Sequence, residues 1–274
     1  MKNHRVLSTE KYLRSLYVSN PLREPIIKTA ISQLGLPLGS CGLDIGCGIG
    51  LYSLLLAEAA GSNGHIVGID TNEEFLEKAC SFASDKRLGN RVTFKKADAS
   101  KLPFQDNTFD WACSMDFIGY GNQDPISLLK EAARVVKPGG LVFILIWSSQ
   151  MLLSGYPLLE ARLNATSSGV APFKATMPPE LHFMRALGWF HQIGFVEPIF
   201  RTFVSNISVP LSSEMRIALT ELFQMRWGET HLEVSPEDWT EYQRLCHPDS
   251  PNFILNVPEY CAFITYSLFY GKVF

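Results

Sequence analysis

Two kinds of hydrophobic pattern follow one another along the first half of the chain. Short apolar runs of strand length occupy residues 39–46, 65–70, 91–97, 109–115 and 141–147. Segments with helical spacing lie between them, at residues 51–60, 72–88 and 125–136. Strands that alternate with helices are typical of a parallel sheet with crossover helices. The pattern therefore predicts an α/β fold with a doubly wound, mostly parallel sheet.

The first strand leads directly into a glycine-rich turn, Leu43-Asp44-Ile45-Gly46-Cys47-Gly48-Ile49-Gly50. Glycine has no Cβ, so a ligand can approach this backbone closely, and the following helix offers free N–H groups. The second strand ends at Asp70, about 20 residues on, which is the usual spacing of a ribose-binding acid. The sequence therefore predicts a site for a nucleoside-containing cofactor.

The spacing of the glycines and the acid before them distinguish between cofactors. A dehydrogenase fingerprint reads G-x-G-x-x-G, whereas here the glycines are Gly46, Gly48 and Gly50. Asp44, two residues before the first glycine, would repel a pyrophosphate and suit a positively charged ligand. S-adenosylmethionine (SAM) carries a sulfonium and an ammonium group and no phosphate. SAM is therefore the expected cofactor, and a dehydrogenase is disfavoured.

Three motifs in this half resemble class I SAM-dependent methyltransferases. "LDIGCGIG" is similar to their first motif, (apolar)-D/E-(apolar)-G-x-G-x-G, without departure. "ADASKLPFQDNTFD" resembles the segment from the adenine-binding acid to the fourth strand, and "LLKEAARVVKPGGLVFILIW" resembles the helix, turn and fifth strand. The resemblance covers roughly residues 40–147. It is closest to the small-molecule branch with the ubiquinone/menaquinone-type and sterol-type methyltransferases.

The resemblance implies a single methyltransferase domain over residues 1–274, with a Rossmann-like sheet of seven strands. The SAM-binding core would span about residues 36–147. A helix at 182–194, an antiparallel sixth strand at 195–209 and a seventh strand at 260–273 would close the sheet. The other segments, about 1–35, 148–180 and 210–258, would form helical cap insertions over the carboxyl ends of the strands, where open α/β sheets bind ligands.

The resemblance also implies roles for individual residues. The glycine loop would lie against the methionine part of SAM, Asp44 near its ammonium group, Asp70 on the ribose hydroxyls and Asp98 on the adenine amino group. Two alternatives stay open: Asp44 as a buried structural carboxylate, and Asp70 as the N-cap of the next helix. The expected cofactor-binding set is Asp44, Gly46, Cys47, Gly48, Gly50, Asp70, Thr71, Asp98, Ala99, Ser114 and Met115.

Asp116 departs from the family pattern, which commonly has a small, polar or apolar residue just past the fourth strand. An acid there would face the transfer site as a candidate catalytic residue that orients a substrate hydroxyl, acts as a base or steadies the sulfonium. The alternative is a solvated loop residue or a cap. Tyr120 is a candidate substrate contact, and His182, lying in apolar surroundings, is expected to be structural.

Composition narrows the function classes. The 274 residues include 46% hydrophobic and 19% charged residues, and the formal charge of −3 offers no general attraction to nucleic acid or anionic lipid. The six cysteines contain no C-x-x-C pair, which indicates buried thiols in a reducing cytoplasm and no metal site. The longest apolar run, Leu141–Trp147, is too short to span a bilayer, and the N-terminus lacks the apolar core of a signal peptide. The oligomeric state is not indicated.

The expected reaction is SAM-dependent methyl transfer to a lipophilic or aromatic small molecule by in-line displacement. Two alternatives are a non-catalytic SAM-binding or regulatory module and a methyltransferase acting on a protein. "SMDFIGY" stands after the fourth strand in place of an Asn-Pro-Pro-Tyr-like motif, which argues against nucleic acid. Apolar side chains outside the expected sheet core would line an acceptor pocket, namely Phe173, Met177, Phe183, Met184, Trp189, Phe223, Trp227, Trp239 and Phe253.

Overall fold

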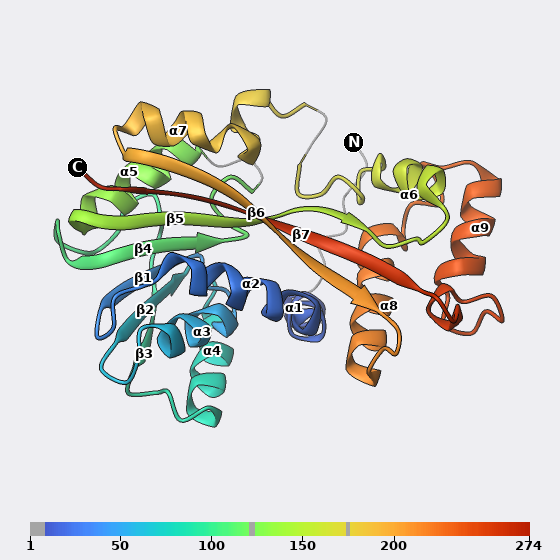
Figure 1. The fold of residues 1–274 in the computed structure, drawn as a ribbon, viewed down its shortest axis with the longest axis horizontal. Coiled ribbons are helices and arrows are strands. Elements are labelled where there is room, and N and C mark those ends of the chain that lie inside the picture. Colours follow the sequence, from blue (N-terminus) through green and yellow to red (C-terminus); the bar gives the residue numbers. More distant parts are fainter. Residues whose placement is uncertain (1–8, 121–123, 174–175) are drawn as a thin grey trace. The chain divides into compact units, whose positions relative to one another are not determined.

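The computed structural model describes residues 9–120, 124–173 and 176–274, so parts of the expected cap segments, residues 1–8 and 174–175, lie outside it. A seven-stranded sheet has the order β3-β2-β1-β4-β5-β7-β6 (Figure 1). The strands are β1 (Cys41–Ile45), β2 (His65–Asp70), β3 (Val92–Lys96), β4 (Phe109–Met115), β5 (Val136–Met151), β6 (Val196–Ser208) and β7 (Cys261–Lys272). The first five pair in parallel, as the alternation of strands and helices predicted.

The last two strands close the sheet, and β7 runs antiparallel to β5. Gly139 and Gly140, at the start of β5, exchange backbone hydrogen bonds with Val273. Further along β5, the Ser148 hydroxyl lies 2.8 Å from that of Thr265. Residue numbers thus rise on β5 while they fall on β7. The predicted seven-stranded, mostly parallel sheet is confirmed, although β5 is longer at both ends than the expected 141–147. The prediction of an antiparallel sixth strand is wrong. The contacts of Val209 with Tyr260 and of Thr202 with Ser267 make β6 antiparallel to β7 and therefore parallel to β5, so the antiparallel strand is β7.

The helices predicted at 51–60, 72–88 and 125–136 are present, and a shorter helix lies within the predicted 182–194. They are α1 (Thr9–Val18), α2 (Asn20–Leu34), α3 (Leu51–Ala59), α4 (Glu73–Asp85), α5 (Pro125–Val135), α6 (Pro157–Asn164), α7 (Ala186–Ile193), α8 (Ser213–Trp227) and α9 (Pro236–Cys246), with 3₁₀ turns η1 (Pro179–Leu181), η2 (Phe183–Arg185) and η3 (Ile254–Asn256). Local capping explains several starts. The Asp124 side chain accepts the Ile126 N–H, and Pro125 occupies the first turn of α5, where a missing N–H costs nothing.

The chain forms two compact units, each made of several segments. The sheet unit comprises the described parts of residues 26–148, 173–203 and 265–274. The helical unit comprises the described parts of residues 1–25 together with 149–172 and 204–264. All of the expected cofactor-binding residues lie within the sheet unit.

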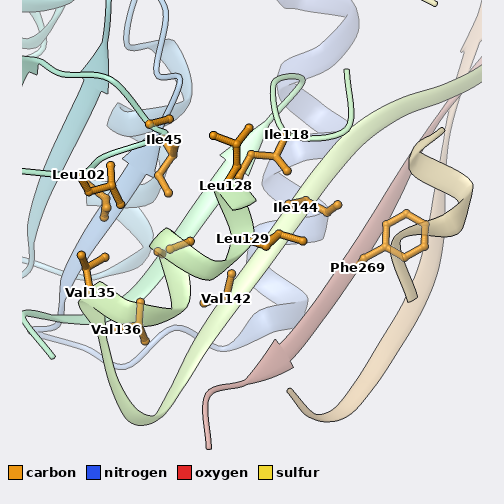
Figure 2. Packing of buried hydrophobic residues seen from close by; sticks show 14 of the residues in the cluster. Ile45, Leu102, Ile118, Leu128, Leu129, Val135, Val136, Val142, Ile144 and Phe269 are labelled. Atoms are coloured by element: carbon orange, nitrogen blue, oxygen red, sulfur yellow. The ribbon is translucent and has the colours of Figure 1, made fainter. Parts of the chain in front are cut away.

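One face of the sheet unit packs against α5 and α7. Figure 2 shows Leu128 and Leu129 of α5 beside Ile144 of β5, with Phe269 of β7 in the same cluster. Phe183 and Trp189 belong to this buried cluster, with exposed fractions of 3% and 4%. The prediction that these two side chains lie outside the sheet core is therefore wrong. Phe183 of η2 and Trp189 of α7 are carried back onto the sheet because the apolar face of α7 needs a buried partner.

The helical unit is organised around α8, which packs against α1, α6 and α9. Phe223 and Trp227 of α8 are fully buried and stack with ring centroids 5.9 Å apart. Trp239 of α9 stacks on Tyr242 at 5.0 Å. These aromatic side chains of the expected cap segments thus serve as packing for the helical unit itself.

Candidate cofactor-binding site

The glycine loop joins β1 to α3 and has left-handed backbone at three positions. Gly46, Gly48 and Gly50 have φ values of 76°, 52° and 75°, which favour glycine over any residue with a side chain. A Cβ on Gly46 would lie 2.5 Å from the Phe117 ring, whereas one on Gly48 would meet nothing within 4 Å. The loop is therefore tightly packed at its start and open at Gly48, where a ligand can approach the backbone.

Asp70 links this loop to the end of β2. Its Oδ2 accepts the Gly48 N–H at 3.0 Å, and its Oδ1 accepts the Asn72 N–H at 2.9 Å. An ionised carboxylate offers about four acceptor positions, so both oxygens keep capacity for ligand hydroxyls. The N-cap alternative does not hold, because the Asn72 side chain caps α4 by accepting the N–H groups of Glu74 and Phe75.

Asp98 follows β3 at the same edge of the sheet. The Ala97 N–H donates to the Asp70 carbonyl at 3.1 Å, which places the ends of β2 and β3 side by side. Asp98 is exposed, and the hydrogen bond it accepts from the Ser100 N–H at 2.8 Å holds the pKa of its carboxyl below the usual range. Ala99 is buried next to it, and Thr71 is exposed after Asp70. A second ionised acceptor therefore lies near Asp70.

Asp44 is enclosed in the middle of the sheet unit. Its side chain is 1% exposed. The Ser53 hydroxyl of α3 donates to Oδ2 at 2.6 Å, and the Cys113 thiol of β4 donates to Oδ1 at 3.7 Å. Burial raises the pKa of this carboxyl to about 6, although the hydroxyl and the thiol both lower it. The carboxyl is therefore mostly ionised at pH 7, despite the cost of burying its charge, and a nearby positive charge would stabilise the ionised form.

The end of β4 is held by its own side chains. Ser114 is buried, and its hydroxyl accepts the Ile118 N–H at 3.0 Å, which turns the chain after the buried Met115. Asp116 has φ 52°, its Oδ1 accepts the Trp147 N–H at 2.8 Å, and its Oδ2 accepts the Tyr266 hydroxyl at 2.7 Å. Asp116 thus ties β4 to β5 and β7, which is not the solvated loop position of the sequence-based alternative.

Several contacts of the site were absent from the sequence analysis. Phe117 packs on Gly46, Ser53 and Cys113 hold Asp44, and Tyr266 holds Asp116. Phe117 could have been found as the large residue after β4, at the edge shared with the glycine loop. Cys113 and Tyr266 carry no sequence signal, because each comes from an element distant in the chain from the acid it contacts, and Ser53 is an ordinary residue of the helix that follows the glycine loop.

No helix within residues 9–120, 124–173 and 176–274 combines the length and apolar content that crossing a bilayer requires. In the same ranges, no group of three or more His, Cys, Asp or Glu side chains is placed to hold a metal ion. The candidate site thus consists of the glycine loop and the acids at the ends of β2 and β3.

The strand order, the antiparallel β7 and the glycine loop after β1 define the fold of class I SAM-dependent methyltransferases. Residues 43–140 match a family described as "Methyltransferase domain". The chain therefore has this fold, and its residues 43–140 are similar to methyltransferase domains.

Two similar proteins are demethylmenaquinone methyltransferases. The one from Oceanobacillus iheyensis is 35% identical over 132 residues, which are 47% of this chain and 53% of that protein. The one from Bacillus licheniformis is 38% identical over 130 residues, 46% of this chain and 52% of that protein. This chain thus spans about half the length of the curated relatives it matches.

One solved structure extends the similarity in fold beyond the matched half. It is phosphoethanolamine N-methyltransferase 2 from Haemonchus contortus, in complex with phosphomonomethylethanolamine and S-adenosylhomocysteine. The TM-score is 0.57 at 18% identity, covering 98% of this chain and 59% of that one. At this identity the likeness concerns the fold alone.

Proposed function

We propose that this chain is a SAM-dependent methyltransferase that acts on a lipophilic or aromatic small molecule. The observation that carries the proposal is the pairing of Gly48 N–H with the Asp70 carboxylate at 3.0 Å, beside a loop whose outer side is open at Gly48. The matched half of the chain is also similar to enzymes whose names include demethylmenaquinone as substrate, which supports an acceptor of this kind.

The residues present fit the cofactor. Asp70 has spare acceptor capacity for two ribose hydroxyls, and the exposed, ionised Asp98 can accept from an adenine amino group. The open backbone at Gly48 suits the methionine part. The remaining members, Cys47, Thr71, Ala99, Ser114 and Met115, would contribute mainly backbone contacts. Because Asp44 is buried, its carboxylate would attract the ammonium group of SAM electrostatically, without direct contact.

Bound SAM supplies an electrophilic methyl group that an acceptor oxygen, nitrogen, carbon or sulfur displaces from the sulfonium, leaving S-adenosylhomocysteine. The contribution of the chain is to position both reactants in line, which can supply roughly 7–11 kcal/mol of the barrier. A general base adds only about 10²–10⁴-fold. Asp116 is proposed for that role, with Tyr120 as a substrate contact, and a protein without a base would still catalyse the transfer.

We further propose a reducing, cytoplasmic setting, which the six free cysteines support, although Cys80 and Cys261 are exposed and not buried as expected. The proposed partner is a small molecule rather than nucleic acid, since the formal charge of −3 provides no general attraction to phosphates.

Methyl transfer can be tested by incubating the chain with methyl-labelled SAM and a panel of lipophilic phenols, hydroquinones and sterols, and measuring S-adenosylhomocysteine. We expect product with at least one aromatic acceptor, and little with Asp70→Ala. The matched control is Asp85→Ala, which removes an exposed carboxylate at the end of α4. Binding of SAM without product from any acceptor would favour the non-catalytic module instead.

A further inference from the structure

A cavity of about 560 Å³ lies in the sheet unit at the turns that precede α7. Its lining is mostly apolar, with two nitrogen-bearing side chains: Phe173, Met177, Pro179, His182, Met184 and Arg185. Apolar walls with a few placed polar groups are typical of sites for small organic molecules. The volume also falls within the usual range of roughly 300–1,000 Å³ for such sites.

His182 is fixed in the wall of this cavity between two phenyl rings. Its ring centroid lies 4.7 Å from that of Phe173 and 4.5 Å from that of Phe183. The Met184 N–H donates to His182 Nδ1 at 3.2 Å, which assigns the proton of the neutral ring to Nε2. Burial lowers the pKa of His182 and so favours this neutral form. The result is a single N–H donor set into an aromatic wall.

Arg185 supplies a second donor on the same turn. Its backbone N–H donates to the His182 carbonyl at 2.8 Å, which keeps the two residues together across η2. Among the residues that the structure describes, neither the Arg185 guanidinium nor His182 Nε2 has a hydrogen-bond or ion-pair partner. Because no neighbouring side chain that the structure describes accepts hydrogen bonds from these two donors, the site favours a ligand whose oxygen can accept them.

The cavity wall also contacts the segment that follows β4. The Tyr120 ring meets the Phe173 ring edge-on at 5.5 Å. A Cβ on Gly119 would lie 3.0 Å from the Trp189 ring, so α7 packs directly on this segment. Trp189 Nε1 in turn donates to the Glu180 carbonyl at 2.8 Å and anchors η1. The cavity therefore adjoins the segment after β4, where the proposed function expects the acceptor.

We infer that this cavity binds the methyl acceptor and selects a planar aromatic molecule with a phenolic oxygen, which accepts hydrogen bonds from His182 Nε2 and Arg185. The inference rests on the proposed function. Phe173 and Met177 would pack on the aromatic ring. An oxygen with phenolate character would gain most, since hydrogen bonds to ionised groups are roughly twice as strong as neutral ones.

The test compares 1-naphthol with naphthalene as probes for the full chain saturated with S-adenosylhomocysteine, using equilibrium dialysis. We expect the chain to bind 1-naphthol about tenfold more tightly than naphthalene. This ratio of dissociation constants corresponds to one hydrogen bond whose net free energy is at the upper end of the usual range. His182→Phe keeps the ring stack and removes the donor, so this preference should fall to about twofold or less. His191→Phe, at an exposed position on α7 outside the cavity, should keep the full preference.

Equal binding of the two probes by the unaltered chain, or an unchanged preference in His182→Phe, would overturn the inference. If His182→Phe does not fold, Arg185→Gln, at an exposed position, serves as the second variant. We expect Arg185→Gln to lose part of the preference for 1-naphthol. An unchanged preference in this variant would contradict the inference. Calorimetry with S-adenosylhomocysteine on the same samples separates the two proposals. Absence of cofactor binding counts against the methyltransferase function, whereas cofactor binding without the 1-naphthol preference counts against the acceptor site alone.

Discussion

Asp44 shows how the surroundings of one residue set its chemistry. The carboxyl is fully enclosed, and burial raises its pKa from 3.8 to about 6. A folded-state pKa above the unfolded value means that the bound proton favours the folded state. This contribution is complete below about pH 4 and is lost as the pH rises through about 6. The shift corresponds to roughly 3 kcal/mol in the free energy of unfolding.

Asp44→Asn should remove this titration. Asn keeps the size and can still accept from Ser53, but it carries no charge at any pH. We expect the unfolding free energy of the variant, relative to the unaltered protein, to increase by roughly 3 kcal/mol between pH 4 and pH 7 without cofactor. Urea denaturation at the two pH values measures this difference. A difference that does not change with pH would mean that Asp44 ionises normally in the folded protein.

Asp116 allows a second test at the scale of one residue. If it acts in methyl transfer, Asp116→Asn should lower turnover by about 10²-fold while the affinity for S-adenosylhomocysteine stays nearly constant. Tyr266→Phe is the matched control, because it removes the hydrogen bond to Oδ2 and leaves the carboxylate. Similar turnover losses in both variants would indicate a structural tie between strands, and normal turnover in Asp116→Asn would leave positioning alone as the source of catalysis.

At the scale of elements, the turn after β5 depends on one buried carboxylate of α6. Glu160 is 3% exposed and accepts the N–H groups of Leu152 and Leu153 at 2.8–2.9 Å. Burial raises the pKa of this carboxyl, and the two N–H groups act against the shift. The Glu160 side chain thus accepts hydrogen bonds from two backbone N–H groups that have no partner in any neighbouring strand that the structure describes.

Glu160→Ala leaves those two donors buried without an acceptor. We expect the free energy of unfolding to fall by about 2–4 kcal/mol, since each unsatisfied buried group costs about 1–3 kcal/mol. Glu160→Gln, with one acceptor oxygen, should lose less. Urea denaturation followed by tryptophan fluorescence measures both variants, with Glu259→Gln at an exposed position as the control. A loss below about 0.5 kcal/mol in Glu160→Ala would show that water replaces the carboxylate.

The positions of helices and strands were predictable from sequence where nearby residues determine them. The strand before Gly46 and the start of α5 at Pro125 follow from apolar period, glycine and proline. Tertiary contacts were not predictable in the same way. Phe183 and Trp189 carry no mark that assigns them to the sheet core rather than to a pocket. The raised pKa of Asp44 likewise depends on neighbours that only the folded chain brings together.

At the scale of the whole molecule, the proposed cofactor-binding residues and the cavity belong to the sheet unit alone. The helical unit has its own aromatic interior around α8. The first unit is recognisable from sequence, because its glycine loop and the acids at its strand ends have the fixed spacings of a cofactor site. The second unit has no such motif, and its apolar, aromatic composition predicted helical cap insertions without indicating how their side chains pack.

The most direct test of the account is a calorimetric titration of the chain with SAM, alongside NAD and the Asp70→Ala variant. We predict a dissociation constant for SAM in the micromolar range and no binding of NAD. Asp70→Ala should weaken SAM binding by roughly 1–3 kcal/mol, or about 5–150-fold, because the ribose hydroxyls lose a charged acceptor. Asp85→Ala should bind SAM like the unaltered chain. Binding of NAD in place of SAM, or equal SAM affinity in Asp70→Ala, would contradict the account.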